Sequence, residues 1–305
     1  MDGRSARLAA LEPLIVVVGP TASGKTELAL ELAEREDGEI VSADSVQVYR
    51  HFDVGTGKPS PEERARAVHH LIDVVEPDTP LDAARWAELA EAGLLSIAER
   101  GKRPIVCGGT FLWVRALLFG LAAAPPASPE IRARHRERAA RSGRAELHAE
   151  LARVDPALAQ RLEPNDLVRV SRALEVFELT GVPLSRWQAE HGFRTPRLQA
   201  RLFGVDRAKP ELDVRIRSRV ERMLESGFVE EVEALLARGF GDARAMGSVG
   251  YKQVRAALEA GTSADRDGLC LAITRATRVF ARRQRTWLRD EPVTWVTGAA
   301  EVTLR

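Results

Sequence analysis

A glycine-rich octapeptide near the N-terminus is the segment of this sequence best suited to chemistry. It follows the aliphatic run Leu14 to Val18, precedes an amphipathic stretch, and fits the pattern GxxxxGK[ST]. In such a loop, backbone amides approach phosphate oxygens, a helix N-terminus adds partial positive charge, the lysine bridges phosphates, and the last hydroxyl can ligate Mg²⁺. The residues expected to bind a diphosphate or triphosphate are Gly19, Pro20, Thr21, Ala22, Ser23, Gly24, Lys25 and Thr26.

The loop alone does not settle the reaction, because it occurs in kinases, in ATP-driven machines and in enzymes that hold a pyrophosphate. An ATPase usually carries an aspartate at the end of an aliphatic strand. Asp44 and Asp73 are the two candidates, and neither follows four aliphatic residues. Phosphate binding is therefore predicted, whereas nucleotide hydrolysis is not.

Short apolar runs alternate with amphipathic stretches over the first third of the chain. Strands are predicted at 14–18, 39–42, 70–75 and 104–107, and helices at 25–36, 81–100 and 111–119. This alternation indicates crossover connections and a parallel sheet. We expect the α/β class, with a P-loop NTPase-like core in which helices flank the sheet.

A proline-rich segment at 122–129 interrupts this alternation, and the pattern after it is helical. Helices are predicted at 130–141, 144–153 and 166–180, then a strand at 202–205, helices at 211–225, 228–238 and 268–289, and a strand at 293–296. We therefore expect a core formed by residues 1–122 and 197–305, and a small all-helical insertion domain at 123–196.

The net charge of +1 conceals an uneven distribution of charge along the chain. Residues 1–122 have a balance of −6 and residues 123–305 a balance of +7, and 40 of the 45 basic residues are arginines. Such asymmetry favours a polyanion as partner of the second part. Salt-bridged, solvated helices are an equally good explanation at this point, and a GC-rich genome would also favour arginine.

The remaining composition limits the compartment in which the protein works. Cys107 and Cys270 have no metal-ligand spacing, so we expect a reducing cytosol and no structural zinc. The run Leu14 to Val18 is too short for a signal-peptide core or a membrane span. We expect a folded cytoplasmic protein that does not contact membranes, and a monomer.

Several segments, taken in order, resemble the tRNA dimethylallyltransferase family, also called tRNA isopentenyltransferases. Its motifs are matched by GPTASGKT at 19–26, DSVQVY at 44–49, HHLID at 69–73, GGT at 108–110, VGYK at 249–252 and RRQRTW at 282–287. A further motif is matched by Asn165, Asp166 and Arg169 together with RALE at 172–175. The match covers about residues 14–290. Each tetrapeptide is weak evidence, but the ordered set is highly specific.

The resemblance implies transfer of a dimethylallyl group from dimethylallyl diphosphate to the exocyclic N6 amine of adenosine 37 in tRNA, next to the anticodon. Lys25, the loop amides and Mg²⁺ held through Thr26 would neutralise the leaving diphosphate. An adenine amine attacks well only when a base removes its proton. Asp44 matches the family's base; the alternatives are a helix cap or a residue that supports a magnesium ligand.

Two further catalytic-site expectations follow from the resemblance. Thr110 matches a residue that contacts tRNA near the reacting base, and it is also suited to cap the helix that follows. An arginine that clamps the diphosphate falls at Arg215 or Arg219, of which we favour Arg219 as a catalytic residue. A solvated helix face, paired with Glu211 or Glu221, explains these two arginines equally well.

The reacting adenosine has to be flipped out of the anticodon loop, and backbone contacts and stacking would offset the cost. Trp287 and Tyr251 are expected to offer ring faces to unstacked bases, and the insertion domain is expected to bind the anticodon stem. The residues that the resemblance places against tRNA are Asp44, Ser45, Val46, Gln47, Thr110, Arg132, Val168, Arg169, Val170, Ser171, Arg172, Gly247, Ser248, Val249, Gly250, Tyr251, Lys252, Arg282, Arg283, Gln284, Arg285, Thr286, Trp287, Leu288 and Arg289.

Three other functions compete with tRNA prenyl transfer. Two are enzymes, a P-loop kinase of a small acceptor and an adenylate prenyltransferase that acts on free nucleotide. The third is an ATP-dependent RNA-binding factor, for which RNA-stimulated ATP hydrolysis is expected. The helical insertion and the arginine-rich C-terminal helix favour an RNA substrate over a free nucleotide.

Overall fold

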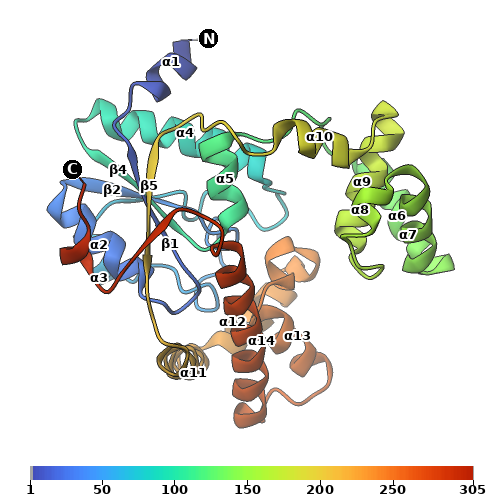
Figure 1. Cartoon of the computed structure of the whole chain (residues 1–305). Coiled ribbons are helices and arrows are strands. Elements are labelled where there is room, and N and C mark those ends of the chain that lie inside the picture. Colours follow the sequence, from blue (N-terminus) through green and yellow to red (C-terminus); the bar gives the residue numbers. More distant parts are fainter. Residues whose placement is uncertain (1–2, 305) are drawn as a thin grey trace. The chain divides into compact units, whose positions relative to one another are not determined.

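A computed structural model describes residues 3–304, and Figure 1 shows its helices and strands. The chain forms two compact units, one of residues up to Phe119 and from Pro196 onward, the other of residues Gly120–Thr195. The second unit starts three residues earlier and ends one residue earlier than the insertion expected at 123–196. No helix in the described residues is both long and apolar enough to cross a membrane.

A six-stranded parallel sheet forms the centre of the first unit, in the order β3-β2-β4-β1-β5-β6. The strands are β1 (Leu14–Val18), β2 (Gly38–Ser42), β3 (His69–His70), β4 (Arg103–Gly108), β5 (Ala200–Val205) and β6 (Val293–Val296). Strand β1 lies between β4 and β5, with Val16 opposite both Val106 and Leu202. Because all strands are parallel, the loops that follow β1, β2 and β4 emerge at the same edge of the sheet.

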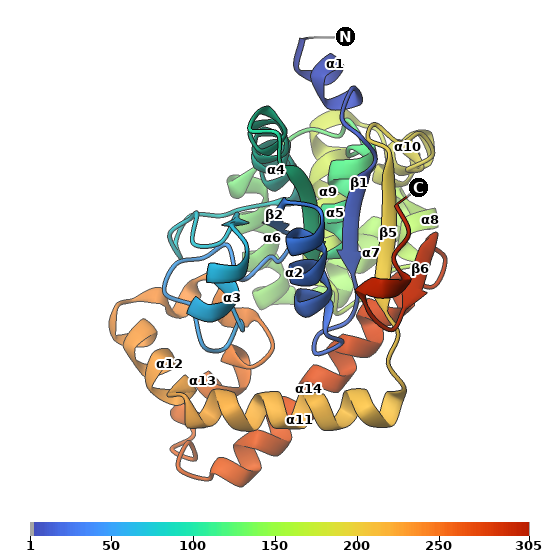
Figure 2. The same cartoon turned by 90° about the vertical axis from the view of Figure 1, so that its left-hand side faces the viewer.

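Helices cover both faces of this sheet, because alternate residues of each strand point to opposite sides. Ile15 and Val17 pack in one apolar cluster with α2 (Lys25–Arg35). Val16 and Val18 pack in another with α4 (Ala83–Glu99) and α5 (Phe111–Phe119). Figure 2 shows α2 on one side of the sheet and α5 on the other. The predicted α/β class, with a parallel sheet flanked by helices, is confirmed.

The other elements of the first unit do not all lie at one edge of the sheet: α11 to α14 lie beyond the edge at which the strands end, whereas α1 lies at the opposite edge (Figure 2). Helices α11 and α14 pack against each other through Leu212, Ile216 and Ala281. Helix α13 was not predicted as a helix, since the sequence indicated only a turn at its start. These elements are α1 (Gly3–Ala9), α3 (Pro61–Arg66), α11 (Lys209–Glu225), α12 (Phe228–Ala237), α13 (Tyr251–Glu259), α14 (Arg266–Trp287) and the 3₁₀ turns Phe240–Asp242, Arg244–Gly247 and Ala299–Glu301.

The strand predicted at 70–75 is wrong beyond His70. Leu71 and Asp73 have φ angles of +61° and +58°, in the left-handed region that an extended strand does not contain. The Asp73 carboxylate is bound by Lys58 and Arg64, so side-chain contacts compensate for this backbone conformation. Val75 forms only an isolated parallel bridge with Tyr49.

The second unit consists of helices packed around an apolar core of its own. Leu147, Leu151, Val170 and Leu174 are among the buried residues of this core. Its helices are α6 (Pro129–Ser142), α7 (Arg144–Val154), α8 (Pro156–Ala159), α9 (Leu167–Thr180) and α10 (Leu184–His191). Helices α8 and α10 were not predicted, and both are short.

Candidate active site

The glycine-rich loop joins the end of β1 to the first turn of α2. Gly19 and Gly24 have φ angles of +152° and +100°, which side-chain-bearing residues rarely adopt. A Cβ atom on Gly19 would come within 2.9 Å of the Ser23 Oγ. No side chain caps the N-terminus of α2, so its amides are available to an anion. The local backbone therefore has the conformation expected of a P-loop.

A cavity of about 350 Å³ opens beside this loop. One part of its wall is polar and includes Lys25, Thr26, Asp44, Thr110 and Arg219. The apolar part is formed by Ile216, Val220, Met223, Val249, Ile273 and Phe280. The loops after β1, β2 and β4 and helices α11 and α14 thus contribute to one hollow, which combines charged and apolar walls.

The charged side chains of the cavity favour the binding of an anion. Burial lowers the pKa of Lys25, and the nearby Arg219 guanidinium lowers it further, while Asp44 raises it. The pKa of Arg219 is also lowered, first by burial, and is raised by Asp44. Two cations near one carboxylate leave an excess of positive charge, which a bound diphosphate would neutralise.

Asp44 follows β2, and one of its carboxylate oxygens is already committed. Its Oδ1 accepts the N–H groups of Val46 and Gln47 at 2.9 and 3.2 Å. Its Oδ2 has no hydrogen-bond partner among residues 3–304, and the side chain lines the cavity. The carboxylate therefore caps a turn rather than a helix, and its second oxygen is free to accept a proton.

Thr110 follows β4 and contacts the loop that carries Asp44. Its Oγ1 accepts the N–H of Ser45 at 3.0 Å and lies 3.2 Å from the Ser45 hydroxyl. The hydroxyl is thus bound to Ser45 and not to the amides of α5. Thr110 and Ser45 both line the cavity beside Asp44, together with Val46 and Gln47.

The two candidate arginines of α11 have different surroundings. Arg219 lines the cavity, and its Nη2 donates to the Thr56 carbonyl at 3.1 Å. The Arg215 Nε donates to the Ala22 carbonyl at 2.9 Å, on the backbone of the phosphate loop. Neither forms an ion pair with Glu211 or Glu221, which pair with other arginines. The position of Arg219 fits a diphosphate clamp, whereas Arg215 supports the loop.

Gln284 on α14 bridges the phosphate loop and the end of β4. Its Oε1 accepts the N–H of Thr21 at 2.9 Å, and its Nε2 donates to the Gly109 carbonyl at 3.0 Å. A Cβ on Gly109 would lie 2.4 Å from that nitrogen, so a larger residue there would displace the Gln284 amide. The sequence grouped Gln284 with tRNA-facing residues; the structure instead commits its amide group to the cavity wall.

Tyr251 at the start of α13 does not offer its ring to an unstacked base, so that expectation is wrong. The residue is buried, and its ring centroid lies 4.9 Å from those of Phe52 and Phe228. Its hydroxyl donates to Glu231 Oε1 at 2.5 Å. Burial beside this carboxylate raises the pKa of Tyr251. The adjacent Lys252 is exposed.

Glu231 on α12, which the sequence did not single out, binds the loop after β2. Its carboxylate accepts the N–H groups of Asp53, Val54 and Gly55 at 3.0, 2.7 and 3.4 Å. No local pattern marks this residue, because these three amides lie 176–178 positions away in the sequence.

The predicted tRNA residues around α13 and α14 divide into exposed and buried groups. Trp287 is 51% exposed, as a stacking role requires, whereas Leu288 is buried. Arg285 pairs with Asp206, and the Thr286 hydroxyl donates to the Arg282 carbonyl. Among the predicted tRNA residues around α13 and α14, the exposed cations that form no ion pair with another described residue are Lys252, Arg282, Arg283 and Arg289. The cavity wall includes Gly247, Ser248, Val249 and Gly250.

The second unit shows the same division within α9. Val168 and Arg169 are exposed, but Val170 and Ser171 are buried, so these two side chains do not reach a surface. The Ser171 hydroxyl lies 2.9 Å from His135 Nδ1. The remaining predicted residues, Arg132 and Arg172, both bind the buried carboxylate of Glu175. Their positive charge is thus partly neutralised inside the unit.

The fold and the site define a class of protein. A parallel sheet whose central strand leads through a glycine loop into an uncapped helix N-terminus is a P-loop fold. The family model described as IPP transferase matches residues 47–291, and the model described as isopentenyl transferase matches residues 13–73. The chain belongs to the IPP transferase family.

Individual relatives agree with this membership. A tRNA dimethylallyltransferase of Sorangium cellulosum is 64% identical over 283 residues, which are 93% of this chain and 90% of the relative. One of Geobacter sulfurreducens is 50% identical over 93% of this chain and 91% of the relative. The crystal structure of a tRNA isopentenylpyrophosphate transferase from Bacillus halodurans has a TM-score of 0.67 at 34% identity, and covers 94% of this chain and 90% of its own.

A more distant structure has the same fold. A eukaryotic dimethylallyltransferase acting on tRNA has a TM-score of 0.77 at 24% identity, and the match covers 95% of this chain and 75% of that one.

Proposed function

We propose that this protein transfers a dimethylallyl group from dimethylallyl diphosphate to the exocyclic N6 amine of adenosine 37 in tRNA, and releases diphosphate. The observation that carries the proposal is the single cavity in which the phosphate loop, the Asp44 carboxylate and an apolar wall meet. Relatives that match nine-tenths of the chain are tRNA dimethylallyltransferases, which supports the same reaction.

The leaving diphosphate is bound by the loop that contains Lys25. The amides at the N-terminus of α2, the Lys25 ammonium and the Arg219 guanidinium stabilise the negative charge that develops as the carbon–oxygen bond breaks. They are placed before the reaction, so little reorganisation accompanies it. Arg215 keeps the loop in place through the Ala22 carbonyl.

Magnesium fits this site as a companion of the diphosphate. The Thr26 hydroxyl lines the cavity and has no hydrogen-bond partner among the described residues, so it is available as a ligand. No group of three or more His, Cys, Asp or Glu residues suited to a metal ion occurs in residues 3–304. Mg²⁺ usually needs only one or two protein ligands, with phosphate oxygens and waters completing its shell. When bound, it would neutralise phosphate charge.

Asp44 is the general base of the proposed reaction. The adenine amine becomes a better nucleophile when its proton is removed as the new carbon–nitrogen bond forms. The free Oδ2 of Asp44 accepts that proton, while the amides of Val46 and Gln47 hold Oδ1. Thr110, bound to Ser45, stands beside the entering base.

The apolar wall favours a prenyl donor over the competing ligands. Met223, Ile273 and Phe280 line the cavity and are suited to a five-carbon chain. Strand β4, beside the phosphate loop, ends in Cys107 and Gly108 and has no carboxylate. Burial raises the pKa of Cys107 to about 11, so it remains a thiol. These features speak against an ATPase or a kinase.

We propose that tRNA is held through the anticodon stem-loop, partly by the cations that lack internal partners. Arg282 is such a cation, whereas Arg278 on the same helix is paired with Asp213. Replacing Arg282 by alanine is expected to lower the slope of log affinity against log salt by about one. The matched Arg278→Ala variant is expected to change the slope less. Equal slopes for Arg282→Ala and the wild type would contradict a phosphate contact.

The reaction itself is tested directly. The protein is incubated with Mg²⁺, dimethylallyl diphosphate and an unmodified tRNA with adenosine at position 37. The tRNA is then digested to nucleosides, whose masses are measured by mass spectrometry. One prenyl unit added to that adenosine is the expected product. Prenylation of free AMP instead would support an adenylate prenyltransferase, and RNA-stimulated ATP hydrolysis without prenylation would support an RNA-binding ATPase. We further propose that the protein works in the cytoplasm as a monomer.

A further inference from the structure

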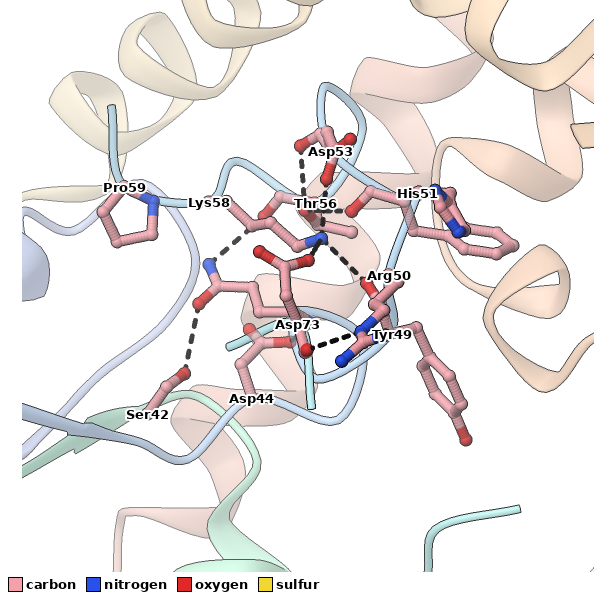
Figure 3. Close-up of polar contacts among 12 residues, drawn as sticks. Ser42, Asp44, Tyr49, Arg50, His51, Asp53, Thr56, Lys58, Pro59 and Asp73 are labelled. Atoms are coloured by element: carbon pink, nitrogen blue, oxygen red, sulfur yellow. Dashed lines mark hydrogen bonds and ion pairs between the residues drawn. The ribbon is translucent and has the colours of Figure 1, made fainter. Parts of the chain in front are cut away.

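Lys58 lies outside the residues that the proposed reaction uses, yet its surroundings are those of a built site. Its side chain is 5% exposed. Its ammonium donates to the Asp53 carboxylate at 2.7 Å, to the Asp73 carboxylate at 2.5 Å and to the Tyr49 carbonyl at 2.7 Å (Figure 3). An ammonium has three protons, and these partners use all of them.

The Lys58 cluster, which consists of Lys58, Asp53, Asp73 and the Tyr49 carbonyl, joins two loops. Tyr49 and Asp53 precede Lys58 in the loop after β2, whereas Asp73 follows β3. The Arg50 Nε also donates to the backbone carbonyl of Asp73 at 3.0 Å. The loop at 49–58 is therefore fastened to the segment after β3, and it has little freedom to move alone.

The residues just before Lys58 contact the candidate active site. The Thr56 carbonyl accepts the Arg219 Nη2 at 3.1 Å, and the Gly57 carbonyl accepts the Gln47 Nε2 at 3.0 Å. A Cβ on Gly57 would lie 2.1 Å from the same Arg219 nitrogen, so the backbone is in close contact with the guanidinium. Arg219 and Gln47 both line the cavity.

We propose that Lys58 and Asp73 are positioning residues for the diphosphate clamp. The cluster holds the Thr56 and Gly57 carbonyls where they orient Arg219 and Gln47, and neither Lys58 nor Asp73 touches the substrate. This assignment gives the Asp73 of the HHLID segment a function that the sequence did not provide. It rests on the proposed role of Arg219 in binding the diphosphate.

The first test measures the binding of inorganic pyrophosphate by calorimetry, alongside transfer kinetics, on the full chain. Lys58→Met keeps the apolar stem and removes the ammonium. We expect pyrophosphate affinity to fall about tenfold, because an oriented charged hydrogen bond is lost, and kcat to fall roughly ten- to hundredfold, as for a misplaced catalytic group. The affinity for tRNA is expected to fall less than the affinity for pyrophosphate, because Gln47 is one of many residues expected to face tRNA.

Lys102→Met is the matched control. Lys102 also pairs with an aspartate, Asp37, but both side chains are exposed and Lys102 precedes β4, at the opposite end of the strands. Its replacement is expected to leave pyrophosphate binding and kcat unchanged. A comparable loss in this control would mean that any broken surface pair has the effect, which would overturn the assignment.

A double variant separates positioning from general destabilisation. If Lys58 acts through Arg219, adding Lys58→Met to Arg219→Met weakens pyrophosphate binding little further. Additive losses, or a folded Lys58→Met protein with wild-type affinity and kcat, would refute the proposal. If Lys58→Met does not fold, Asp73→Asn tests it, with a smaller loss expected than for Asp73→Ala because the amide keeps one acceptor. If the wild-type protein binds pyrophosphate but does not transfer a prenyl group, the proposed function is refuted, whereas the positioning role of Lys58 is not.

Discussion

Tyr251→Phe is the substitution that separates a structural from an RNA-binding role most sharply. It removes the hydroxyl that donates to Glu231 and keeps the ring between Phe52 and Phe228. A hydrogen bond to a charged group contributes about 1.5–3 kcal/mol. Because Glu231 keeps its bonds to three backbone amides, we expect the free energy of unfolding to fall by about 1.5–2 kcal/mol, the lower part of that range.

Urea unfolding followed by circular dichroism measures this loss, and filter binding measures tRNA affinity. Tyr49→Phe is the matched control, since the Tyr49 hydroxyl only accepts the Leu81 N–H at 3.4 Å. Its replacement is expected to change the unfolding free energy by less than about 1 kcal/mol. An unchanged urea midpoint for Tyr251→Phe, together with weakened tRNA binding, would show that the buried position is wrong and that the phenol faces RNA.

Three further predictions concern the cavity. Asp44→Asn is expected to lower kcat by about 10²–10⁴-fold, as for loss of a general base, while pyrophosphate binding measured by calorimetry persists; full turnover would exclude Asp44 as the base. Arg219→Met is expected to weaken pyrophosphate binding more than Arg215→Met, and the reverse order in the same titration would reassign the clamp. Because burial lowers the pKa of Lys25, its ammonium is lost at a lower pH than that of an exposed lysine. Wild-type pyrophosphate affinity should therefore fall, relative to Lys25→Arg, as pH rises through that lowered pKa; a constant ratio of the two affinities up to about pH 10 would contradict this.

The phosphate loop and the sheet were predictable because their determinants are local. The run Leu14–Val18 is buried on both faces and therefore uniformly apolar, and the spacing of Gly19, Gly24 and Lys25 defines the loop without distant contacts. The same holds for α2, whose apolar face repeats at helical spacing. Asp44 was identified as a candidate through the resemblance, and its turn is also local.

The inner wall of the site was not predictable from local pattern. Tyr251 and Gln284 were assigned to the RNA surface because they fall in the VGYK and RRQRTW segments, which the resemblance places against tRNA. Their actual partners are Glu231, Thr21 and residues after β4, which only the tertiary fold brings near. The wrong strand assignment at Asp73 has the same cause, because its segment is aliphatic enough for a strand, whereas its carboxylate binds Lys58 and Arg64 and its backbone is left-handed.

The hydrogen bond between Gln284 and Thr21 spans 263 positions of the chain, so it also has a consequence for biosynthesis. A ribosome makes the glycine loop more than two hundred residues before the last turns of α14. Domains generally fold as units during synthesis, and here the unit that contains the loop cannot be completed until α14 has emerged. A nascent chain stalled before Gln284 would lack one wall of its cavity, and transferase activity should appear only after α14 has left the exit tunnel.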